Sequence, residues 1–199
     1  TLWIVFIFIS LSRKPREFSR RSIREALKTT SKWESKLDIA THIVLFLFWI
    51  AALILYVIYP DWMTYYTIPL PTWLRWAAIG AAIFPLSLLA WAHHALREEF
   101  STQLQLRERH TLVTNGPYRW MRHPIYAAEF MFMISVAAES ANSLVAPAMG
   151  LGIIFLYGRV KKEEAMMIDR FGDEYRNYMK RTGRFLPRLK ISGAKKLGE

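Results

Sequence analysis

Long apolar runs alternate with charged segments along this chain of 199 residues. Residues 43–59 and 76–92 contain no charged side chain, and each approaches the ~20 residues that a helix needs to cross a lipid bilayer. Residues 1–11 form a third apolar run. Because a soluble domain of this length rarely carries such runs, the pattern predicts an all-α integral membrane protein.

The apolar pattern divides into five expected transmembrane segments, at residues 1–11, 39–59, 73–93, 125–138 and 144–157. The last two are shorter than a full span, and the turn-like residues 139–143 join them, which predicts a tight C-terminal helical hairpin. Pro85 cannot donate a backbone hydrogen bond, so it predicts a kink in the third segment. We expect residues 1–11 to belong to a spanning helix rather than to a signal peptide, since no small-residue cleavage site follows them.

The polar segments organise the expected single domain, residues 1–199. The first three helices and a basic loop at 13–36 are expected within 1–100, the cofactor-binding catalytic region within 101–187, and a disordered tail at 188–199. Two polar helices are also expected: an amphipathic one at 23–36, and one over 161–181 that is interrupted at Gly172.

The net charge of +11 is distributed unevenly along the chain. Residues 13–36 are rich in Lys and Arg, whereas the loops 60–72 and 139–143 contain neither. This is the positive-inside pattern, and it predicts that 13–36, 93–122 and the C-terminal tail face the cytoplasm. Anionic lipid headgroups account for the basic charge better than a nucleic-acid partner does. The chain has no cysteine, which excludes disulfides, thiolate catalysis and Cys-ligated metals.

A polar, basic stretch from His110 to Tyr126 lies between apolar segments. Pro124 suits the first turn of a helix, so His123 is predicted to cap the fourth segment, with Tyr126 one turn inside. The free amides of such a helix start bind anions such as a carboxylate. The alternative is that Arg122 and His123 are interfacial anchors.

Four further charged residues have both a functional and an ordinary interpretation. Glu129 lies inside an apolar segment, where a carboxylate is a functional candidate, or it pairs with an arginine across the hairpin. Arg159 either holds a substrate carboxylate or anchors its helix at the interface. Glu163 and Glu164 either accept hydrogen bonds from ribose, adenine or ammonium groups, or form a solvated cluster balanced by lysines.

The sequence lacks the motifs of several catalytic mechanisms that soluble enzymes use. No Gly-x-Gly-x-x-Gly, Gly-x-Ser-x-Gly or P-loop pattern occurs. No metal-ligand spacing occurs either, because His93 and His94 are adjacent and point to different helix faces. We expect both of these histidines to be interfacial, and no bound metal.

Together, the polar motifs resemble the isoprenylcysteine carboxyl methyltransferase (ICMT) family, part of a wider group of membrane methyltransferases that includes phospholipid methyltransferases. The resemblance covers about residues 103–187. It rests on motifs in the same order: Gln103, His110-Thr-Leu-Val113, Gly116, Tyr118, Arg122-His-Pro-x-Tyr126, Arg159, Glu163-Glu164, Phe171-Gly-x-Glu-Tyr175-x-x-Tyr178 and Thr182-Gly183-Arg184.

The resemblance implies methyl transfer from S-adenosyl-L-methionine, with S-adenosyl-L-homocysteine as product, to a lipophilic small molecule or lipid-modified acceptor such as an isoprenylcysteine carboxylate. It implies a cofactor site without a Rossmann fold, lined by Gln103, His110, Thr111, Leu112, Val113, Tyr118, His123, Pro124, Ile125, Tyr126 and Glu163. Within that site His123 and the helix start would take the cofactor's carboxylate, while Arg159 would contact the substrate. A carboxylate acceptor is already ionised at neutral pH, whereas an amine or thiol would need a base, with Glu129 or His123 as candidates.

The sequence is also compatible with two other functions. The pattern Arg-His-Pro-x-Tyr-x-x-Glu, ending at Glu129, also resembles NADPH-dependent membrane sterol and steroid reductases. A non-enzymatic membrane scaffold would keep the same helices. The eukaryotic ICMT enzymes carry more transmembrane helices than the five expected here, which leaves the acceptor undetermined.

Overall fold

A computed structural model describes residues 64–96 and 112–188, together with isolated helical positions between residues 40 and 61. The expected segment 1–11, the amphipathic helix at 23–36 and the tail beyond residue 188 lie outside the described residues. Every element described is helical apart from two isolated β-bridges, which confirms the all-α prediction for this part of the chain.

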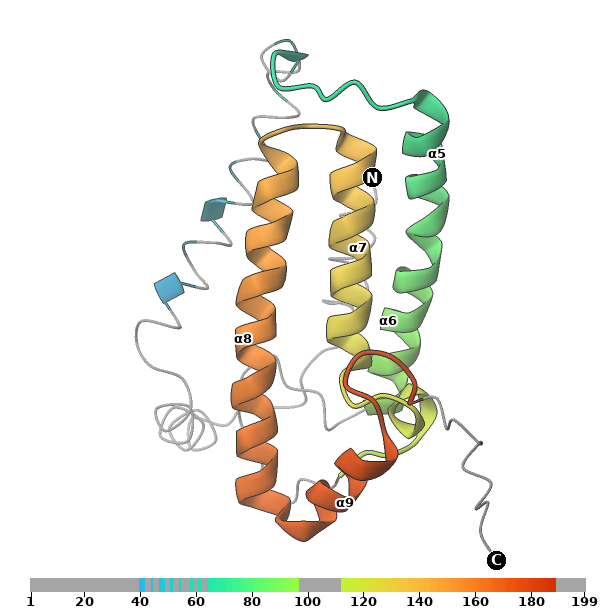
Figure 1. The fold of residues 1–199 in the computed structure, drawn as a ribbon, viewed down its shortest axis with the longest axis vertical. Coiled ribbons are helices and arrows are strands. Elements are labelled where there is room, and N and C mark those ends of the chain that lie inside the picture. Colours follow the sequence, from blue (N-terminus) through green and yellow to red (C-terminus); the bar gives the residue numbers. More distant parts are fainter. Residues whose placement is uncertain are drawn as a thin grey trace, which may run out of the picture.

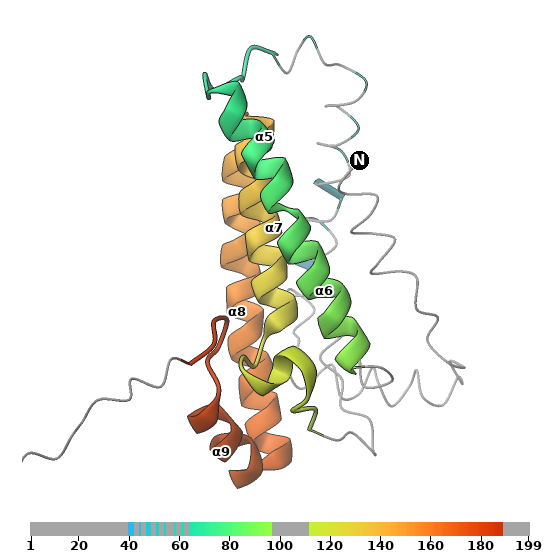
Figure 2. The same ribbon diagram turned by 90° about the vertical axis from the view of Figure 1, so that its right-hand side faces the viewer.

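Three long helical rods lie side by side, and a short helix covers one end (Figure 1). The elements are α5 (Thr72–Ala81), α6 (Ile83–Leu96), the 3-10 helix η2 (Gly116–Arg119), α7 (Pro124–Ser140), α8 (Val145–Phe171) and α9 (Asp173–Arg181). Helix α7 lies between α8 and the α5–α6 rod, which crosses it obliquely (Figure 2).

Helices α5 and α6 form one nearly continuous rod, interrupted at Ala82. Pro85 lies one turn further on, and its missing N–H and its ring disturb the helix at that turn, as predicted. The Leu86 amide still donates to the Ala82 carbonyl at 3.3 Å, so the rod continues. Among the described residues this segment, Thr72–Leu96, is the one long and apolar enough to cross a membrane.

The predicted hairpin is present, but its second helix is much longer than the apolar pattern indicated. Helix α7 has 17 residues and α8 has 27, which makes α8 about 40 Å long. The expected end of the fifth segment at residue 157 is therefore wrong as a helix end. A helix satisfies its own backbone whatever its side chains, so the change to polar residues alters what α8 contacts without ending it.

The turn between α7 and α8 is fixed by hydrogen bonds at the end of the bundle opposite α9. Ala141 takes the left-handed conformation with φ 46°, and its carbonyl accepts from the Ile68 amide at 2.6 Å. The side-chain oxygen of the buried Asn142 accepts from the amides of Leu144 and Val145, which fixes the turn at the start of α8. These contacts confirm the predicted turn.

Small side chains allow the helices to pack closely in the core. One cluster joins Ala82, which lies between α5 and α6, to Phe132, Val136 and Met149 of the hairpin. The outer faces are also apolar: Ile83, Phe84, Ile134, Leu151 and Ile154 are each at least 60% exposed. Apolar surface on this scale indicates an apolar surrounding or partner.

Candidate active site

A C-terminal segment pairs with the start of α7. We call residues 182–186, which follow α9, the C-terminal strap. The Gly183 amide donates to the Trp120 carbonyl at 3.0 Å, and the Arg122 amide donates to the Gly183 carbonyl at 2.8 Å. The His123 amide donates to the Arg184 carbonyl at 3.0 Å. Residues about 60 positions apart are thus joined by main-chain bonds at the polar end of the bundle.

Two glycines permit close backbone approach around this pairing. A Cβ on Gly183 would lie 1.8 Å from the Leu186 carbonyl oxygen, so no other residue fits the strap's turn. Gly116 has φ +55°, and a Cβ there would lie 2.8 Å from the Ala95 Cβ, so η2 rests directly on the end of α6. The Tyr178 hydroxyl then joins α9 to η2 by donating to the Tyr118 carbonyl at 2.6 Å.

The buried Glu164 carboxylate is the centre of an ionic network beneath the strap. It accepts hydrogen bonds from Arg122 Nε at 3.0 Å and from Arg184 Nε at 3.2 Å, while His123 Nε2 lies 3.3 Å away. Arg122 also donates Nη1 to the carbonyls of Met179 and Thr182, at 3.1 and 2.6 Å. One carboxylate therefore ties α8 to α7, the end of α9 and the strap.

This network sets the ionisation of Glu164, which lies in the polar half of α8 beyond the predicted spanning segment. Burial alone would raise its pKa, but hydrogen bonds from His123, Arg184 and Arg122 outweigh burial and lower the pKa to about 2. The same bonds raise the pKa of Arg184 above its ordinary value. Glu164 is thus a permanent anion at neutral pH and can only accept hydrogen bonds.

The neighbouring Glu163 carboxylate has different surroundings. It accepts a hydrogen bond from the Tyr126 hydroxyl at 2.8 Å, and its side chain is 30% exposed. Burial, reinforced by the Glu163 charge, raises the pKa of Tyr118 well above its ordinary value. The Glu163 carboxylate can thus accept further hydrogen bonds, and its side chain is partly exposed.

Glu129 and Arg159 face the Glu163 side of the hairpin. The charges of Arg159 and Glu163 both act on Glu129, and the charge of Arg159 acts on Tyr126. The pairing of Glu129 with an arginine across the hairpin stays a prediction.

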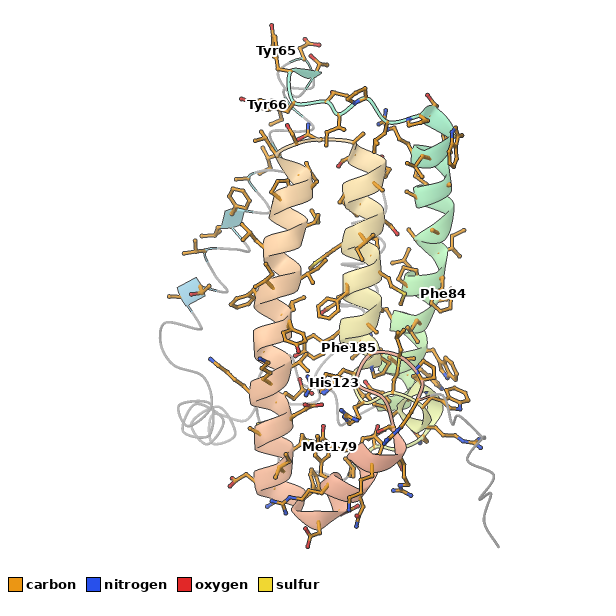
Figure 3. All side chains as sticks on the ribbon, in the orientation of Figure 1. Tyr65, Tyr66, Phe84, His123, Met179 and Phe185 are labelled. Carbon is orange, nitrogen blue, oxygen red and sulfur yellow. The ribbon has the colours of Figure 1, made fainter. Side chains whose placement is uncertain are left out.

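Aromatic rings close the site on its apolar side. Phe185 of the strap lies with its ring centroid 5.1 Å from Phe130, 6.0 Å from Tyr157 and 6.1 Å from His123. Figure 3 shows Phe185 and His123 next to each other between the strap and α8. Phe185 therefore packs against aromatic rings from both helices of the hairpin and against the histidine of the ionic network.

Of the residues expected in the cofactor site, the structure brings His123 and Tyr126 to Glu163, and Tyr118 is bonded to α9 through Tyr178. Pro124 is buried, and Ile125 packs against the cluster of Leu88, Leu89 and Ala128. Helix α7 begins at Pro124 after His123, as predicted, although no side-chain cap bond forms. Leu112 and Val113 are half-buried in the irregular segment before η2, and Gln103, His110 and Thr111 lie outside the described residues.

Sequence reasoning misplaced one histidine, did not name Phe185, and named Glu164 and Arg184 without predicting that they pair. His93 is buried rather than interfacial, with Nδ1 2.8 Å from the Leu89 carbonyl oxygen, whereas His94 is exposed. The central position of Glu164, its pairing with Arg184 and the packing of Phe185 were not predicted. The Thr182-Gly183-Arg184 motif was the available signal, but a motif does not say what it contacts.

Fold and site define an all-α protein with apolar outer helix faces and an ionic site at one end of the bundle. Residues 78–169 match the model of the isoprenylcysteine carboxyl methyltransferase (ICMT) family, so this part of the chain is similar to that family. This region runs from α5 through most of α8, so the strap lies outside it.

Similar proteins include animal and bacterial relatives. The protein-S-isoprenylcysteine O-methyltransferase of Rattus norvegicus is 34% identical over 122 residues, which are 60% of this chain and 43% of the rat protein. The nickel-cobalt-cadmium resistance protein NccN of Alcaligenes xylosoxydans xylosoxydans is 32% identical over 85 residues, 43% of this chain and 40% of that protein. This chain thus spans less than half the length of these two curated relatives.

A solved structure supports the relationship. The eukaryotic intramembrane Ras methyltransferase ICMT matches with a TM-score of 0.55 and 26% identity, over 74% of this chain and 52% of that chain. This likeness to an intramembrane enzyme implies that the present chain is also a membrane protein.

Proposed function

We propose that this protein transfers a methyl group from S-adenosylmethionine to a lipophilic acceptor at the membrane interface. The acceptor group proposed is a carboxylate, such as that of an isoprenylcysteine, because the animal relatives are named protein-S-isoprenylcysteine O-methyltransferases. The proposal includes five transmembrane segments with the catalytic region facing the cytoplasm.

The observation that carries the proposal is the Tyr126–Glu163 pair at the polar end of the α7–α8 hairpin. Its 2.8 Å hydrogen bond orients a half-buried carboxylate that still has unused lone pairs. Donor groups on a cationic ligand, such as an ammonium or ribose hydroxyls, suit such a carboxylate. The hydrogen-bond acceptors of this site therefore fit the donor groups of S-adenosylmethionine. When bound, S-adenosylmethionine would supply a methyl group activated by its sulfonium.

The chain's own residues would bind the cofactor, orient the acceptor and exclude water. Glu163, Tyr126, Tyr118 and the neighbouring backbone of Leu112 and Val113 would hold the cofactor. Phe185, packed against Phe130 and Tyr157, would keep water from the reacting groups on the apolar side.

Arg159 lies four residues before Glu163 on the continuous helix α8, so both side chains occupy one helix face. We propose that Arg159 orients the carboxylate of the acceptor through its planar guanidinium. A carboxylate acceptor is ionised at neutral pH and attacks the methyl group without a base. Placing the two reactants in line is then the main contribution to the rate.

The exposed apolar faces of α5 to α8 support entry of the acceptor from the lipid. Ile83 and Phe84 on the rod and Leu151 and Ile154 on α8 would contact acyl chains, while the ionic site lies at the opposite end from the α7–α8 turn. A polar cofactor and a lipophilic acceptor would meet where the apolar outer faces adjoin the ionic site.

Isothermal titration on detergent-purified protein tests the proposal. S-adenosylhomocysteine should bind to the wild type and NADPH should not. Binding of NADPH alone would support a membrane reductase, and binding of neither would support a scaffold. Turnover with a prenylated cysteine carrying a free carboxylate, compared with its methyl ester, then tests the acceptor class.

A further inference from the structure

Aromatic side chains with polar tips lie at the surface of the bundle, at the end that carries the ionic site. Trp91, Trp120 and Tyr157 are each between 39% and 45% exposed. The rings of Trp91 and Trp120 meet edge to face, with 5.6 Å between their centroids. Each side chain combines an apolar ring with one N–H or O–H group, so all three suit a boundary between apolar and polar surroundings.

An exposed cation lies over two of these rings. The guanidinium carbon of Arg119 is 5.9 Å from the Trp120 ring centroid, and Lys161 Nζ is 5.2 Å from the Tyr157 ring centroid. The ring attracts the cation electrostatically, and the cation can still donate N–H bonds outward to an anion. Each pair thus offers a ring to apolar chains and a positive charge to a phosphate group.

The two cation–aromatic pairs lie at the same level of the bundle but on different sides of it. The Gly183 amide is bonded to the Trp120 carbonyl at 3.0 Å, and two residues further along the strap the Phe185 ring lies 6.0 Å from Tyr157. Trp120 follows η2 on the α6 side of α7, whereas Tyr157 belongs to α8 on the other side (Figure 1). A single protein partner would cover one face, whereas a lipid bilayer surrounds the whole bundle.

Exposed aromatic side chains also mark the opposite end of the bundle. Trp73 is exposed at the start of the rod, and Tyr65 lies at the end away from His123 (Figure 3). Trp91 follows Trp73 by 18 residues, which is about 27 Å along a helix and close to the ~30 Å thickness of the hydrocarbon core. Residues 76–90 carry no charge. The rod thus has the spacing of a span with an aromatic residue at each membrane surface.

We propose that Trp91, the Arg119–Trp120 pair and the Tyr157–Lys161 pair form a headgroup girdle, which holds the ionic site at the depth of the phospholipid phosphates. Tryptophan and tyrosine are enriched at the headgroup level, and arginine and lysine reach phosphate oxygens from there. The ionic site begins two residues after Trp120, so the girdle places it in the headgroup layer rather than in bulk water or hydrocarbon. Neither cofactor nor acceptor takes part in these contacts, so the girdle does not depend on the proposed methyl transfer.

Spin-label EPR of the full chain in phosphatidylcholine vesicles tests the depth, because the protein has no cysteine of its own. Nitroxides are attached to Ala90→Cys and to Gly158→Cys, at exposed positions next to Trp91 and Tyr157. A Cβ on Gly158 meets nothing within 4 Å, so this substitution leaves the girdle intact. Collision rates with oxygen and with a nickel chelate give the depth of each label, and both labels should lie at the phosphate level.

Two further labels calibrate the depth. Ile134→Cys, on the exposed apolar face of α7, should be accessible to oxygen and not to the nickel chelate, whereas Arg176→Cys on α9 should be accessible to the chelate. A label at 90 as deep as the one at 134, or as accessible to the chelate as the one at 176, would overturn the girdle even if Gly158→Cys does not fold. Clearly different depths at 90 and 158 would indicate a protein partner on one face and would overturn it as well.

Native mass spectrometry with phosphatidylglycerol tests the two cations. Arg119→Gln and Lys161→Gln should each weaken lipid binding about fivefold, because each removes one contact to the headgroup. Arg181→Gln, which neutralises an exposed arginine on α9, is the matched control and should bind the lipid as the wild type does. Equal weakening in all three variants, or in none, would overturn the girdle. Since no cofactor enters these measurements, their failure would leave the proposed function standing, and failure to bind S-adenosylhomocysteine would leave the girdle standing.

Discussion

Glu163 and Glu164 are adjacent in the sequence, yet their carboxylates lie in opposite kinds of surroundings. Glu164 is buried and its partners are arginines and a histidine, whereas Glu163 is 30% exposed and accepts from a tyrosine. The first arrangement consumes the hydrogen-bonding capacity of the carboxylate, and the second leaves part of it for a ligand. Substitutions at the two positions should therefore have different consequences.

Glu163→Gln should weaken S-adenosylhomocysteine binding by about 1.5–3 kcal/mol, because a neutral amide replaces a charged acceptor of the same size. The melting temperature without ligand should stay near the wild-type value, since the side chain is partly exposed. Titration calorimetry and thermal unfolding give the two numbers. Unchanged affinity would remove Glu163 from the site.

Glu164→Gln should destabilise the folded protein at pH 7 by on the order of 3 kcal/mol, because Arg122 and Arg184 lose their counter-ion. The folded pKa of about 2 lies below the ordinary value of about 4.3, so this stabilisation is complete above pH 5. It is lost as the pH falls from about 4 through 2. The gap in melting temperature between wild type and variant should therefore close in acid, and a gap independent of pH would contradict the network. Glu174→Gln, an exposed neutralisation in α9, should show no gap at either pH.

Gly183→Ala should prevent the strap from pairing with Trp120 and Arg122, because its Cβ would meet the Leu186 carbonyl. We expect a loss of about 2–3 kcal/mol in unfolding free energy. Gly150→Ala is the matched control: its Cβ would meet nothing within 4 Å, and alanine in a helix should add about 0.5–1 kcal/mol. Thermal unfolding in detergent compares them, and equal melting temperatures would refute the strap's contribution.

Arg159→Lys separates a substrate clamp from a lipid anchor. Lysine keeps the charge and the reach to the interface but loses the planar fork. If Arg159 orients a carboxylate, turnover of a methyl acceptor should fall substantially while affinity for S-adenosylhomocysteine stays near wild type. Equal turnover in the two proteins would leave Arg159 as an anchor only.

The proposed five-segment topology places residues 65 and 181 on opposite sides of the membrane. The chain has no cysteine, so Tyr65→Cys and Arg181→Cys each introduce a single label site, and both positions are exposed. A membrane-impermeant thiol reagent should label one variant in intact cells and the other only after the membrane is opened. Labelling of both from one side would break the topology.

The sequence by itself determined the elements that depend on local physics. Alternation of apolar and polar residues located α7 and the end of the rod, Pro85 located the interruption near Ala82, and Gly172 located the boundary between α8 and α9. Proline and glycine act through their own backbone, so their effect is visible without knowing the neighbours.

Only the tertiary structure decided what the polar residues do. Arg122 and Arg184 lie on segments about 60 residues apart, and no periodicity records that both reach Glu164. The same holds for Phe185, which contacts three rings from α7, α8 and the residue before α7. An adjacent pair of glutamates has the same sequence whether it is buried or solvated. Burial depends on the packing of distant segments and not on the local sequence.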